Sequence, residues 1–241
     1  MKPELFIVMP AYNESANIKM VVKLWHPVVE KNGNGSKLII FDDGSKDDTY
    51  IVLQELEKKY PLLKAISKIN SGHGATCLYA YDYAIKAGAK YVFQTDSDGQ
   101  TNPDEFWQFW QLKEKYDFII GSRIKRKDGL SRIFVTKVLK MVVWLFFGVV
   151  VEDSNTPFRL MNVERLKKIL EYVPEQFFLS NVIISMLAVK FGERYKWIPI
   201  SFQERQGGIN SINLKMIFRI GKSALSSFFK IRKELKGVEI K

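Results

Sequence analysis

The stretch LFIVMPAYNES, residues 5–15, decides how the chain folds, because in it a short apolar run ends in polar residues. Short apolar runs that end in this way are typical of buried parallel strands. The segments between such runs have helical patterns, as in residues 17–30, where apolar side chains recur at steps of three and four. The pattern predicts an α/β protein with a mostly parallel sheet flanked by helices. The further runs that we interpret as strands are KLIIFDD (37–43), KAIS (64–67), YVFQTD (91–96), DFIIGS (117–122), PFRLMN (157–162) and KWIPISF (196–202).

The chain is strongly basic, with 37 Lys and Arg residues against 26 Asp and Glu residues and a formal net charge of +11. Such an excess favours an anionic partner: nucleotide phosphates, nucleic acid or an acidic membrane surface. The single cysteine, Cys77, excludes a disulfide within the chain. The apolar run at residues 138–151 is shorter than the ~20 residues of a spanning helix, and the beginning of the chain lacks a signal-peptide pattern. We therefore expect a cytoplasmic protein without a transmembrane segment.

Parallel α/β sheets bind ligands beyond the carboxyl ends of their strands, so the polar ends of the runs are where chemistry is expected. At the first end, Tyr12 and Glu14 fit a plain helix start poorly, since an aromatic ring beside a carboxylate can stack on and bond a base or ribose. At the second end, Asp42 and Asp43 fall where a strand delivers side chains into the crevice. The next two acids, 47 and 48, are expected to be first-turn acids that the helix dipole favours.

The glycines of NSGHGAT, residues 70–76, would let the backbone approach a ligand closely before the next helix. The stretch lacks a full dinucleotide fingerprint, and no Walker-type GxxxxGK[ST] pattern occurs in the chain. His73 within this stretch is interpreted as a polar turn residue.

Alternating polar residues follow the fourth run, in QTDSDGQ (94–100). Asp96, Asp98 and Gln100 would project to one side of an extended segment, and their oxygens suit a hard divalent cation, Mg²⁺ or Mn²⁺. A calcium loop is excluded, because Trp107 stands where its final Glu would be. The alternative is an Asx-rich turn before a helix that begins at Pro103.

Taken together and in order, these motifs resemble the family 2 glycosyltransferases, inverting enzymes of GT-A fold, and most of all their dolichyl- or polyprenyl-phosphate sugar synthase branch. The matching stretches are VMPAYNE, FDDGSKDDT, NSGHGAT, QTDSDGQ, GSR (121–123), DSNTPFRLM (153–161) and RQGGINSIN (205–213). One departure is Pro157, which stands where this motif commonly has glycine.

The resemblance implies a role for each matching position. The metal site for the donor diphosphate would be Asp96, Asp98 and Gln100. Basic residues facing phosphates or the acceptor would be Arg123, Arg159 and Arg205, although Arg123 fits a surface charge equally well. The residues that would bind the nucleotide-sugar are Pro10, Ala11, Tyr12, Glu14, Asp42, Asp43, Gly72, Asp96 and Ser97.

The resemblance also implies that Asp153 is the acid near the acceptor, and its chemistry depends on that acceptor. A sugar hydroxyl must lose a proton, which Asp153 would take as a general base. A lipid phosphate is already largely ionised near neutral pH, since its second pKa is about 6. In that case Asp153 would orient the acceptor or help to organise the metal.

The end of the chain departs from the transmembrane helices that many polyprenyl-phosphate transferases carry. Its apolar and basic residues predict a basic amphipathic helix and tail at 213–241, after a catalytic GT-A domain at 1–212. Such a helix either lies in an acidic membrane interface or packs on the domain with a solvated basic face. The run 138–151 is interpreted as buried core, with a position beside a lipid-acceptor groove as the alternative.

The prediction is therefore a metal-dependent glycosyltransferase at the cytoplasmic membrane face, which moves a sugar from a UDP- or GDP-sugar to a polyprenyl phosphate or a lipid-linked or cell-surface glycan. A sugar nucleotidyltransferase would also use a parallel sheet, acids and a metal, but it usually needs a Gly-rich basic loop near the first strand. A basic nucleic-acid-binding or membrane-binding domain would fit the charge. Because no RRM, KH or helix-turn-helix signature accompanies that charge, we expect no nucleic-acid partner.

Overall fold

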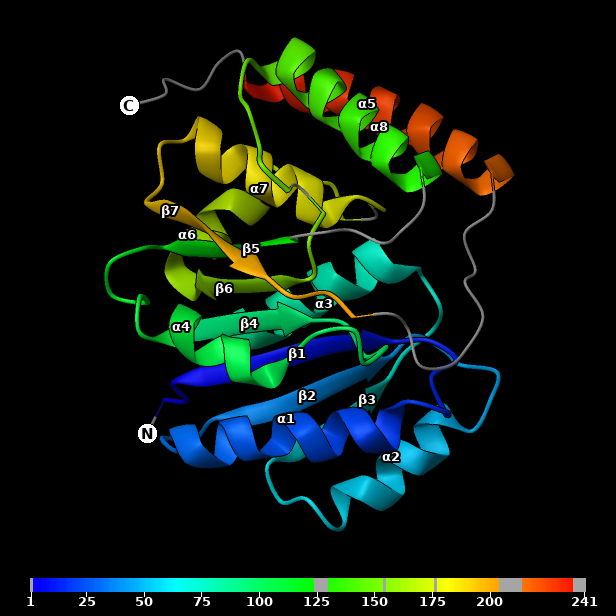
Figure 1. Cartoon of the computed structure of the whole chain (residues 1–241), viewed down its shortest axis with the longest axis vertical. Coiled ribbons are helices and arrows are strands. Elements are labelled where there is room, and N and C mark those ends of the chain that lie inside the picture. Colours follow the sequence, from blue (N-terminus) through cyan, green and yellow to red (C-terminus); the bar gives the residue numbers. More distant parts are fainter. Residues whose placement is uncertain (1, 124–129, 154, 176, 204–213, 236–241) are drawn as a thin grey trace.

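The computed structural model describes residues 2–123, 130–153, 155–175, 177–203 and 214–235. In these residues the strands form one seven-stranded sheet in the order β3-β2-β1-β4-β6-β5-β7 (Figure 1). Each strand lies where an apolar run predicted one. The bounds are β1 Leu5–Ala11, β2 Lys37–Asp42, β3 Leu63–Ser67, β4 Tyr91–Thr95, β5 Phe118–Arg123, β6 Phe158–Asn162 and β7 Tyr195–Ile200.

The sheet is parallel except for β6, which runs antiparallel to both of its neighbours, β4 and β5. Phe158, the first residue of β6, is therefore paired with Thr95, the last residue of β4. This reversal was not predicted, because an apolar run carries no information about its direction. As a result, the segment that precedes β6 lies at the same edge of the sheet as the carboxyl ends of the parallel strands.

Helices cover both faces of the sheet, as predicted for an α/β protein (Figure 1). Alternate residues of β1 show the division, because Leu5, Ile7 and Met9 pack with α1 while Phe6 and Val8 pack with α3. The first face carries α1 (Ile18–Asn32), α2 (Thr49–Glu57), the 3₁₀ turn η1 (Pro103–Glu105) and α4 (Phe106–Trp110). The second carries α3 (His73–Lys86), α6 (Val163–Leu170) and α7 (Ser180–Lys190), and beyond them α5 (Leu130–Phe147) and α8 (Leu214–Leu235).

An aromatic cluster on the first face fixes β4 and β6 against the helices. The Phe93 ring on β4 has its centroid 4.7 Å from that of Phe158 on β6, 5.6 Å from Trp25 on α1 and 5.0 Å from Phe106 on α4. All four side chains are buried. Because each such ring buries about 150–250 Å², this cluster is a large part of the core beneath the carboxyl edge.

The outermost helices, α5 and α8, pack side by side (Figure 1), and several of their apolar side chains are exposed. The Phe146 and Phe229 rings meet at 4.7 Å, and the Phe147 and Phe228 rings at 5.5 Å. The prediction of a buried core at 138–151 is right for Val143 and Phe147 but wrong for Met141, Trp144 and Leu145, which are 54–58 % exposed. The reason is that α5 lies in the outermost layer and packs against α7 and α8, which leaves these three side chains uncovered. None of the described helices has both the length and the apolar character needed to cross a bilayer.

Candidate active site

The candidate site lies at the carboxyl edge, where the ends of β1, β2, β4 and β5 meet the segment that precedes β6. The last residues of β1 and β2, Ala11 and Asp42, are paired in register, and β4 lies on the other side of β1. Ser97, just past the end of β4, donates from its hydroxyl to the carbonyl of Pro10 at 2.7 Å. The stretches predicted to bind the nucleotide-sugar are therefore brought together by the sheet.

The loop after β1 is tied to the loop after β2 by hydrogen bonds. The backbone N–H of Glu14 donates to the Thr49 hydroxyl at 2.8 Å, and the backbone N–H of Asn13 donates to the Ser45 hydroxyl at 2.9 Å. The Glu14 side chain is buried and accepts a bond from the amide of Asn17 at 2.7 Å. Tyr12, by contrast, is exposed. Of the two residues predicted to contact a nucleoside here, Tyr12 is the one that solvent reaches.

Asp43 organises the loop between β3 and α3. Its carboxylate accepts bonds from the Lys68 ammonium, from the Ser71 N–H at 2.9 Å and from the Gly72 N–H at 2.8 Å. Gly72 has a φ of +88°, a conformation that glycine adopts readily. Lys68 supplies the cation that the cluster of acids after β2 requires, and sequence reasoning missed it because a single lysine after a strand carries no distinctive pattern.

Asp42 is also buried, and it accepts a bond from the Ser67 hydroxyl at 3.1 Å. The two predicted nucleotide ligands at the end of β2 thus differ in their partners. Asp43 accepts bonds from a lysine ammonium and from two backbone N–H groups of the β3–α3 loop. Among the described residues, Asp42 has no ammonium partner: it accepts from the Ser67 hydroxyl and, at 3.3 and 3.4 Å, from the Ser45 backbone N–H. Asp42 is therefore the better candidate for a nucleoside contact, because the Asp43 carboxylate is already paired with Lys68.

Helix α3 begins very close to the segment before α7. A methyl group on Gly74 would lie 2.2 Å from the carbonyl oxygen of Phe177 and 2.3 Å from that of Phe178. Only a residue without a side chain allows this approach. The close contact places His73 beside β4, where its Nε2 lies 2.9 Å from Oδ1 of Asp96.

His73 is therefore more than the polar turn residue that the sequence predicted. Burial lowers the pKa of the imidazole, but Cys77 and the Asp96 carboxylate outweigh burial and raise it well above its usual value near 6.5. The histidine brings positive charge next to one of the acids predicted to bind metal. The signal in the sequence is a histidine between two glycines after a strand, and it does not reveal the partner.

The segment after β4 contains both features that the sequence left open, a turn and a group of oxygen donors. The Gln100 N–H donates to Oδ1 of Asp98 at 3.1 Å, which forms the Asx-type turn, and the Gln100 side-chain amide donates to the carbonyl of Gln203 at 2.7 Å. The latter bond uses the amide nitrogen and not Oε1. No cluster of three or more His, Cys, Asp or Glu side chains suited to a metal occurs in the described part of the chain.

Asp96 and Asp98 nevertheless fit one type of metal site. Mg²⁺ and Mn²⁺ are commonly held by one or two carboxylates, with water and substrate phosphates as the remaining ligands. The residues that could hold a divalent cation here are Asp96, Asp98 and, through its amide oxygen, Gln100. Such a site would be completed by a diphosphate and not by protein alone.

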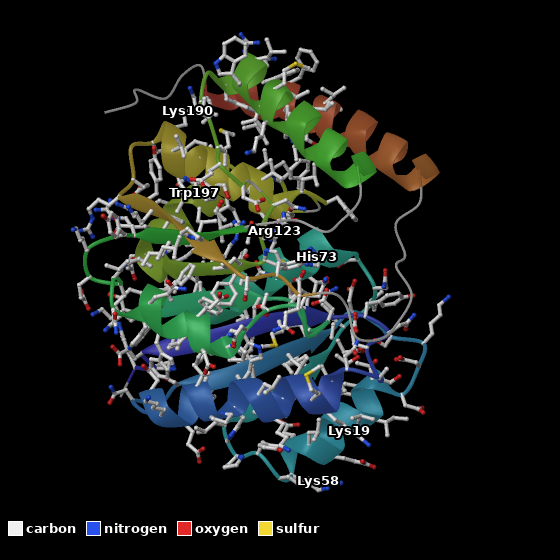
Figure 2. The ribbon with its side chains drawn as sticks, in the orientation of Figure 1. Lys19, Lys58, His73, Arg123, Lys190 and Trp197 are labelled. Atoms are coloured by element: carbon white, nitrogen blue, oxygen red, sulfur yellow. The ribbon has the colours of Figure 1, made fainter. Side chains whose placement is uncertain are left out.

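Asp153 and Arg123 form a bidentate ion pair beside this segment. The Arg123 Nε donates to Oδ2 of Asp153 and its Nη2 to Oδ1, each at 2.9 Å, and both side chains are largely buried. The ring of Phe202 lies 5.2 Å from the guanidinium carbon. Arg123, labelled in Figure 2, is therefore not a surface charge, and the structure joins two predicted site residues that are far apart in the sequence.

Arg159 lies inside the protein, which differs from the phosphate-facing position that the sequence predicted. Its guanidinium donates to the carbonyl of Thr156 at 2.8 Å, to the carbonyl of Asn181 at 3.1 Å and to the hydroxyl of Ser185 at 3.3 Å. Burial lowers the pKa of Arg159 below its usual value. A strand-like pattern does not reveal that α7 covers this face of β6. Arg205, the third predicted basic residue, lies outside the described residues.

Solved structures share this fold. Glucosyl-3-phosphoglycerate synthase of Mycobacterium tuberculosis, in complex with Mn²⁺, UDP-glucose and phosphoglyceric acid, has a TM-score of 0.67 to this chain at 18 % sequence identity, and the match covers 96 % of this chain and 80 % of that one. The same enzyme in complex with UDP has a TM-score of 0.65 at 17 % identity. At such low identity the likeness shows the fold, which is of the GT-A type.

Curated relatives are more similar in sequence. The UDP-N-acetylglucosamine–dolichyl-phosphate N-acetylglucosaminyltransferase of Methanococcus voltae is 30 % identical over 187 residues, which is 69 % of this chain and 72 % of the relative. The polyprenol monophosphomannose synthase of Mycolicibacterium smegmatis is 25 % identical over 218 residues, 86 % of this chain and 80 % of the relative. The family model "Glycosyl transferase family 2" matches residues 6–180. The chain therefore belongs to glycosyl transferase family 2.

Proposed function

We propose that this glycosyltransferase moves a sugar from a UDP- or GDP-sugar to the phosphate of a polyprenyl phosphate, with inversion at the anomeric carbon. The observation that supports this most directly is the group of acids and bases at the carboxyl edge: Asp96 and Asp98 after β4, and the Asp153–Arg123 pair beside them. The relatives named above support the acceptor class, since dolichyl phosphate and polyprenol phosphate stand in their names.

The donor nucleoside would lie at the ends of β1 and β2. Tyr12 is exposed there and offers a ring for stacking, and Asp42 offers a carboxylate to a base or ribose. The backbone of Pro10 and Ala11, with Ser97 and Gly72 beside it, would form the floor and one wall. Glu14 and Asp43 would act indirectly, by fixing the two loops.

The donor diphosphate would lie over Asp96 and Asp98, which with Gln100 would hold Mg²⁺ or Mn²⁺. A divalent cation at this position neutralises negative charge on the diphosphate. His73 borders the same site from the protein side, since its Nε2 lies 2.9 Å from Oδ1 of Asp96. Charge stabilisation of this kind is usually the largest contribution to a transfer in which an anion departs.

The transfer breaks the bond between the anomeric carbon and the diphosphate oxygen and forms one between that carbon and a phosphate oxygen of the acceptor. The nucleoside diphosphate leaves with the electron pair. A phosphate acceptor already carries charge near neutral pH and needs no base. Both oxygens of Asp153 are fixed by Arg123, so we assign Asp153 the task of orienting the acceptor. With a sugar hydroxyl as acceptor, Asp153 would instead take the proton.

The reaction can be tested with the purified chain, a set of UDP- and GDP-sugars, polyprenyl phosphate and Mn²⁺. We expect sugar to appear on the lipid phosphate, and transfer to stop when EDTA removes the metal. Equal transfer with EDTA would contradict the metal, and transfer only to a glycan hydroxyl would contradict the acceptor. Release of diphosphate from sugar-1-phosphate and a nucleoside triphosphate would favour the nucleotidyltransferase alternative.

We also propose that the outer face of α5 and α8 contacts an acidic membrane, which would bring the enzyme to a lipid acceptor at the cytoplasmic face. The exposed apolar residues of this face include Met141, Trp144 and Leu145 on α5 and Leu225 and Phe229 on α8. Two basic residues accompany them. Arg232 and Lys190, the latter labelled in Figure 2, line an open depression of about 430 Å³ together with Trp144. Apolar insertion combined with attraction to anionic headgroups is how interfacial helices bind.

Vesicle sedimentation tests this surface. The double variant Trp144→Glu/Leu145→Glu should lose binding to phosphatidylglycerol vesicles, and the wild type should bind phosphatidylcholine vesicles far less. Ile51→Glu on α2 is the matched control, because Ile51 is also an exposed apolar residue, at 57 %, but on the opposite face of the sheet. Unchanged sedimentation of the double variant would exclude this surface. The division of the chain into a catalytic unit at 1–212 and a helix and tail at 213–241 is part of the same proposal.

A further inference from the structure

A chain of buried polar side chains runs from the interior of the protein to Asp96. The Tyr81 hydroxyl on α3 donates to Oδ1 of Asn181 on α7 at 3.1 Å. The Asn181 amide donates to Oε1 of Gln94 on β4 at 3.2 Å, and the Gln94 amide donates to Oδ1 of Asp96 at 3.2 Å. Tyr81, Asn181 and Gln94 are each at most 2 % exposed. The site described above uses none of these three residues.

Each hydrogen bond in this row of side chains is donated in the direction of Asp96. The chemistry of the groups at its two ends requires this direction. An ionised carboxylate only accepts hydrogen bonds, so Gln94 must present its NH₂ group to Asp96 and its oxygen to Asn181. Asn181 must then present its own NH₂ group to Gln94 and its oxygen to a donor. Tyr81 is that donor, because burial above all raises the pKa of its hydroxyl well above the usual value and keeps the proton in place.

Arg159 also holds this row of hydrogen-bonded side chains from one side. Gln94 and Arg159 are directly opposite each other in the β4–β6 ladder. The Arg159 guanidinium donates to the carbonyl of Asn181 and to the hydroxyl of Ser185, and this hydroxyl donates in turn to the Asn181 carbonyl at 2.8 Å. The buried arginine that sequence reasoning placed at a phosphate thus fixes the first turn of α7, and with it the amide of Asn181.

Buried amides and hydroxyls destabilise a protein unless each is hydrogen-bonded, and apolar side chains of similar size avoid that risk. A connected set of three in one core is therefore informative about what it holds. Its end point is one oxygen of Asp96, which also lies 2.9 Å from His73 Nε2. Among the described residues, no hydrogen bond involves the other oxygen, Oδ2. The two donors on Oδ1 fix the rotation of the carboxylate and keep Oδ2 for a ligand.

We propose that Gln94, oriented by Asn181 and Tyr81, is a positioning residue that sets the Asp96 carboxylate for a divalent cation bound together with a nucleoside diphosphate. This inference rests on the proposed function, and it adds residues that the motif at 96–100 does not contain. It also explains why a buried glutamine stands two residues before the first acid of that motif.

The test measures metal binding directly. Mn²⁺ is titrated by calorimetry into the chain with saturating UDP, and separately with saturating GDP. Gln94→Leu removes the bond to Asp96 with little change in size, and we expect it to weaken Mn²⁺ binding about 10-fold or more, as loss of a partner that orients a metal ligand does. In turnover, it should raise the KM for Mn²⁺ more than it lowers kcat at saturating metal.

Two further variants separate positioning from stability. Tyr81→Phe removes only the hydroxyl that lies farthest from Asp96 in this row of hydrogen bonds. It should weaken Mn²⁺ binding by a smaller factor than Gln94→Leu. Ser180→Ala is the matched control, because it removes a neighbouring buried hydroxyl on α7 that has no hydrogen-bond partner among the described residues. It should leave Mn²⁺ binding unchanged.

The outcomes distinguish this inference from the proposed function. If wild type binds Mn²⁺ with UDP or GDP and both network variants bind it equally well, Gln94 and Tyr81 are structural residues and the inference is overturned, whatever their melting temperatures. If Gln94→Leu fails to fold, Tyr81→Phe decides in the same way. If wild type binds no Mn²⁺ with either nucleotide, the proposed metal site fails, and the positioning role falls with it.

Discussion

The carboxyl edge of the sheet and the α5–α8 layer satisfy their side chains in opposite ways. At the carboxyl edge, buried charges are paired or hydrogen-bonded: Asp43 with Lys68, Asp153 with Arg123. On the outer layer, large apolar side chains such as Trp144 and Phe229 remain exposed. In the first region the named charged side chains find their partners within the protein, which is consistent with the proposed binding of a small charged ligand. The second exposes large apolar side chains beside basic ones, which is consistent with the proposed contact with an acidic membrane.

The largest effect should come from the carboxyl edge. Asp98→Ala removes a proposed metal ligand, and we expect sugar transfer to fall at least ~1,000-fold, which corresponds to ~4 kcal/mol of barrier. Vesicle binding should be unchanged, because the two regions are separate. Transfer rates with purified lipid phosphate measure the first effect. Near-normal turnover of this variant would remove the metal from the mechanism.

Breaking the ion pair at the same edge should cost stability as well as activity. Arg123→Ala takes away the bidentate partner of a largely buried carboxylate, which typically destabilises by about 3–5 kcal/mol. We expect a lower midpoint of urea unfolding and loss of transfer. The double variant Arg123→Ala/Asp153→Ala is the control, since it also removes the carboxylate and should recover part of the stability without recovering transfer. If the double variant is no more stable than Arg123→Ala, burial of the charge is not the cause.

Gly74→Ala tests whether the approach of α3 to Phe177 determines the site. The added methyl group would meet two backbone carbonyls at 2.2 and 2.3 Å, so α3 must shift, at a cost of about 1–3 kcal/mol. The shift would also move His73 away from Asp96 and lower transfer. Gly33→Ala serves as comparison, because Gly33 has a φ of +63° but no neighbour within 4 Å. It should lower stability through backbone strain alone and leave transfer intact. Equal loss of transfer in both variants would contradict the role of the contact.

The smallest expected effect is on stability. It concerns the ion pair between Asp117 and Arg194 at the amino end of β5, the end opposite the candidate site. Hydrogen bonds from Arg194 hold the pKa of the Asp117 carboxyl below its usual value near 3.8. The pair therefore stabilises the fold at pH values above the unfolded pKa, and this contribution is lost as the pH falls through the folded one. Because Arg194 is 58 % exposed, we expect only about 1 kcal/mol.

Unfolding in urea between pH 2 and 6 measures that contribution. Asp117→Asn should be less stable than wild type at pH 6, and the difference should shrink toward pH 2. Asp82→Asn, which alters an exposed helical ion pair with Lys86, is the control and should change little at any pH. A constant difference between Asp117→Asn and wild type across this range would show that the loss is not electrostatic.

The sequence predicted the positions of all seven strands, because each is an apolar run that turns polar at its end. It predicted the neighbourhood of Asp42 and Asp96 for the same reason, since parallel strands deliver their ends to one edge. It did not predict the direction of β6, the burial of Arg159 or the half-exposed face of α5. Each of these depends on which element lies next to the residue in space, and a local pattern of apolar and polar residues does not contain that information.

Local sequence patterns also did not predict which residues the site residues contact. Lys68 and His73 contact acids that lie 25 and 23 positions away in the sequence, through loops whose course is set by Gly72 and Gly74. The glycines were recognised, but as a way for the backbone to approach a ligand. At Gly74 the close approach is instead to the protein's own chain.

The antiparallel strand β6 also bears on how such an enzyme can change its acceptor over evolutionary time. The whole segment between β5 and β6 enters and leaves the sheet through two strands that are hydrogen-bonded to each other. A replacement of that segment, α5 included, would leave in register the ladder between β4 and β6 and the strand ends proposed to bind the donor. Under the proposed function, the acceptor-orienting Asp153 and the α5 part of the membrane surface would then be exchangeable together, without rebuilding the strand ends proposed to bind the nucleotide.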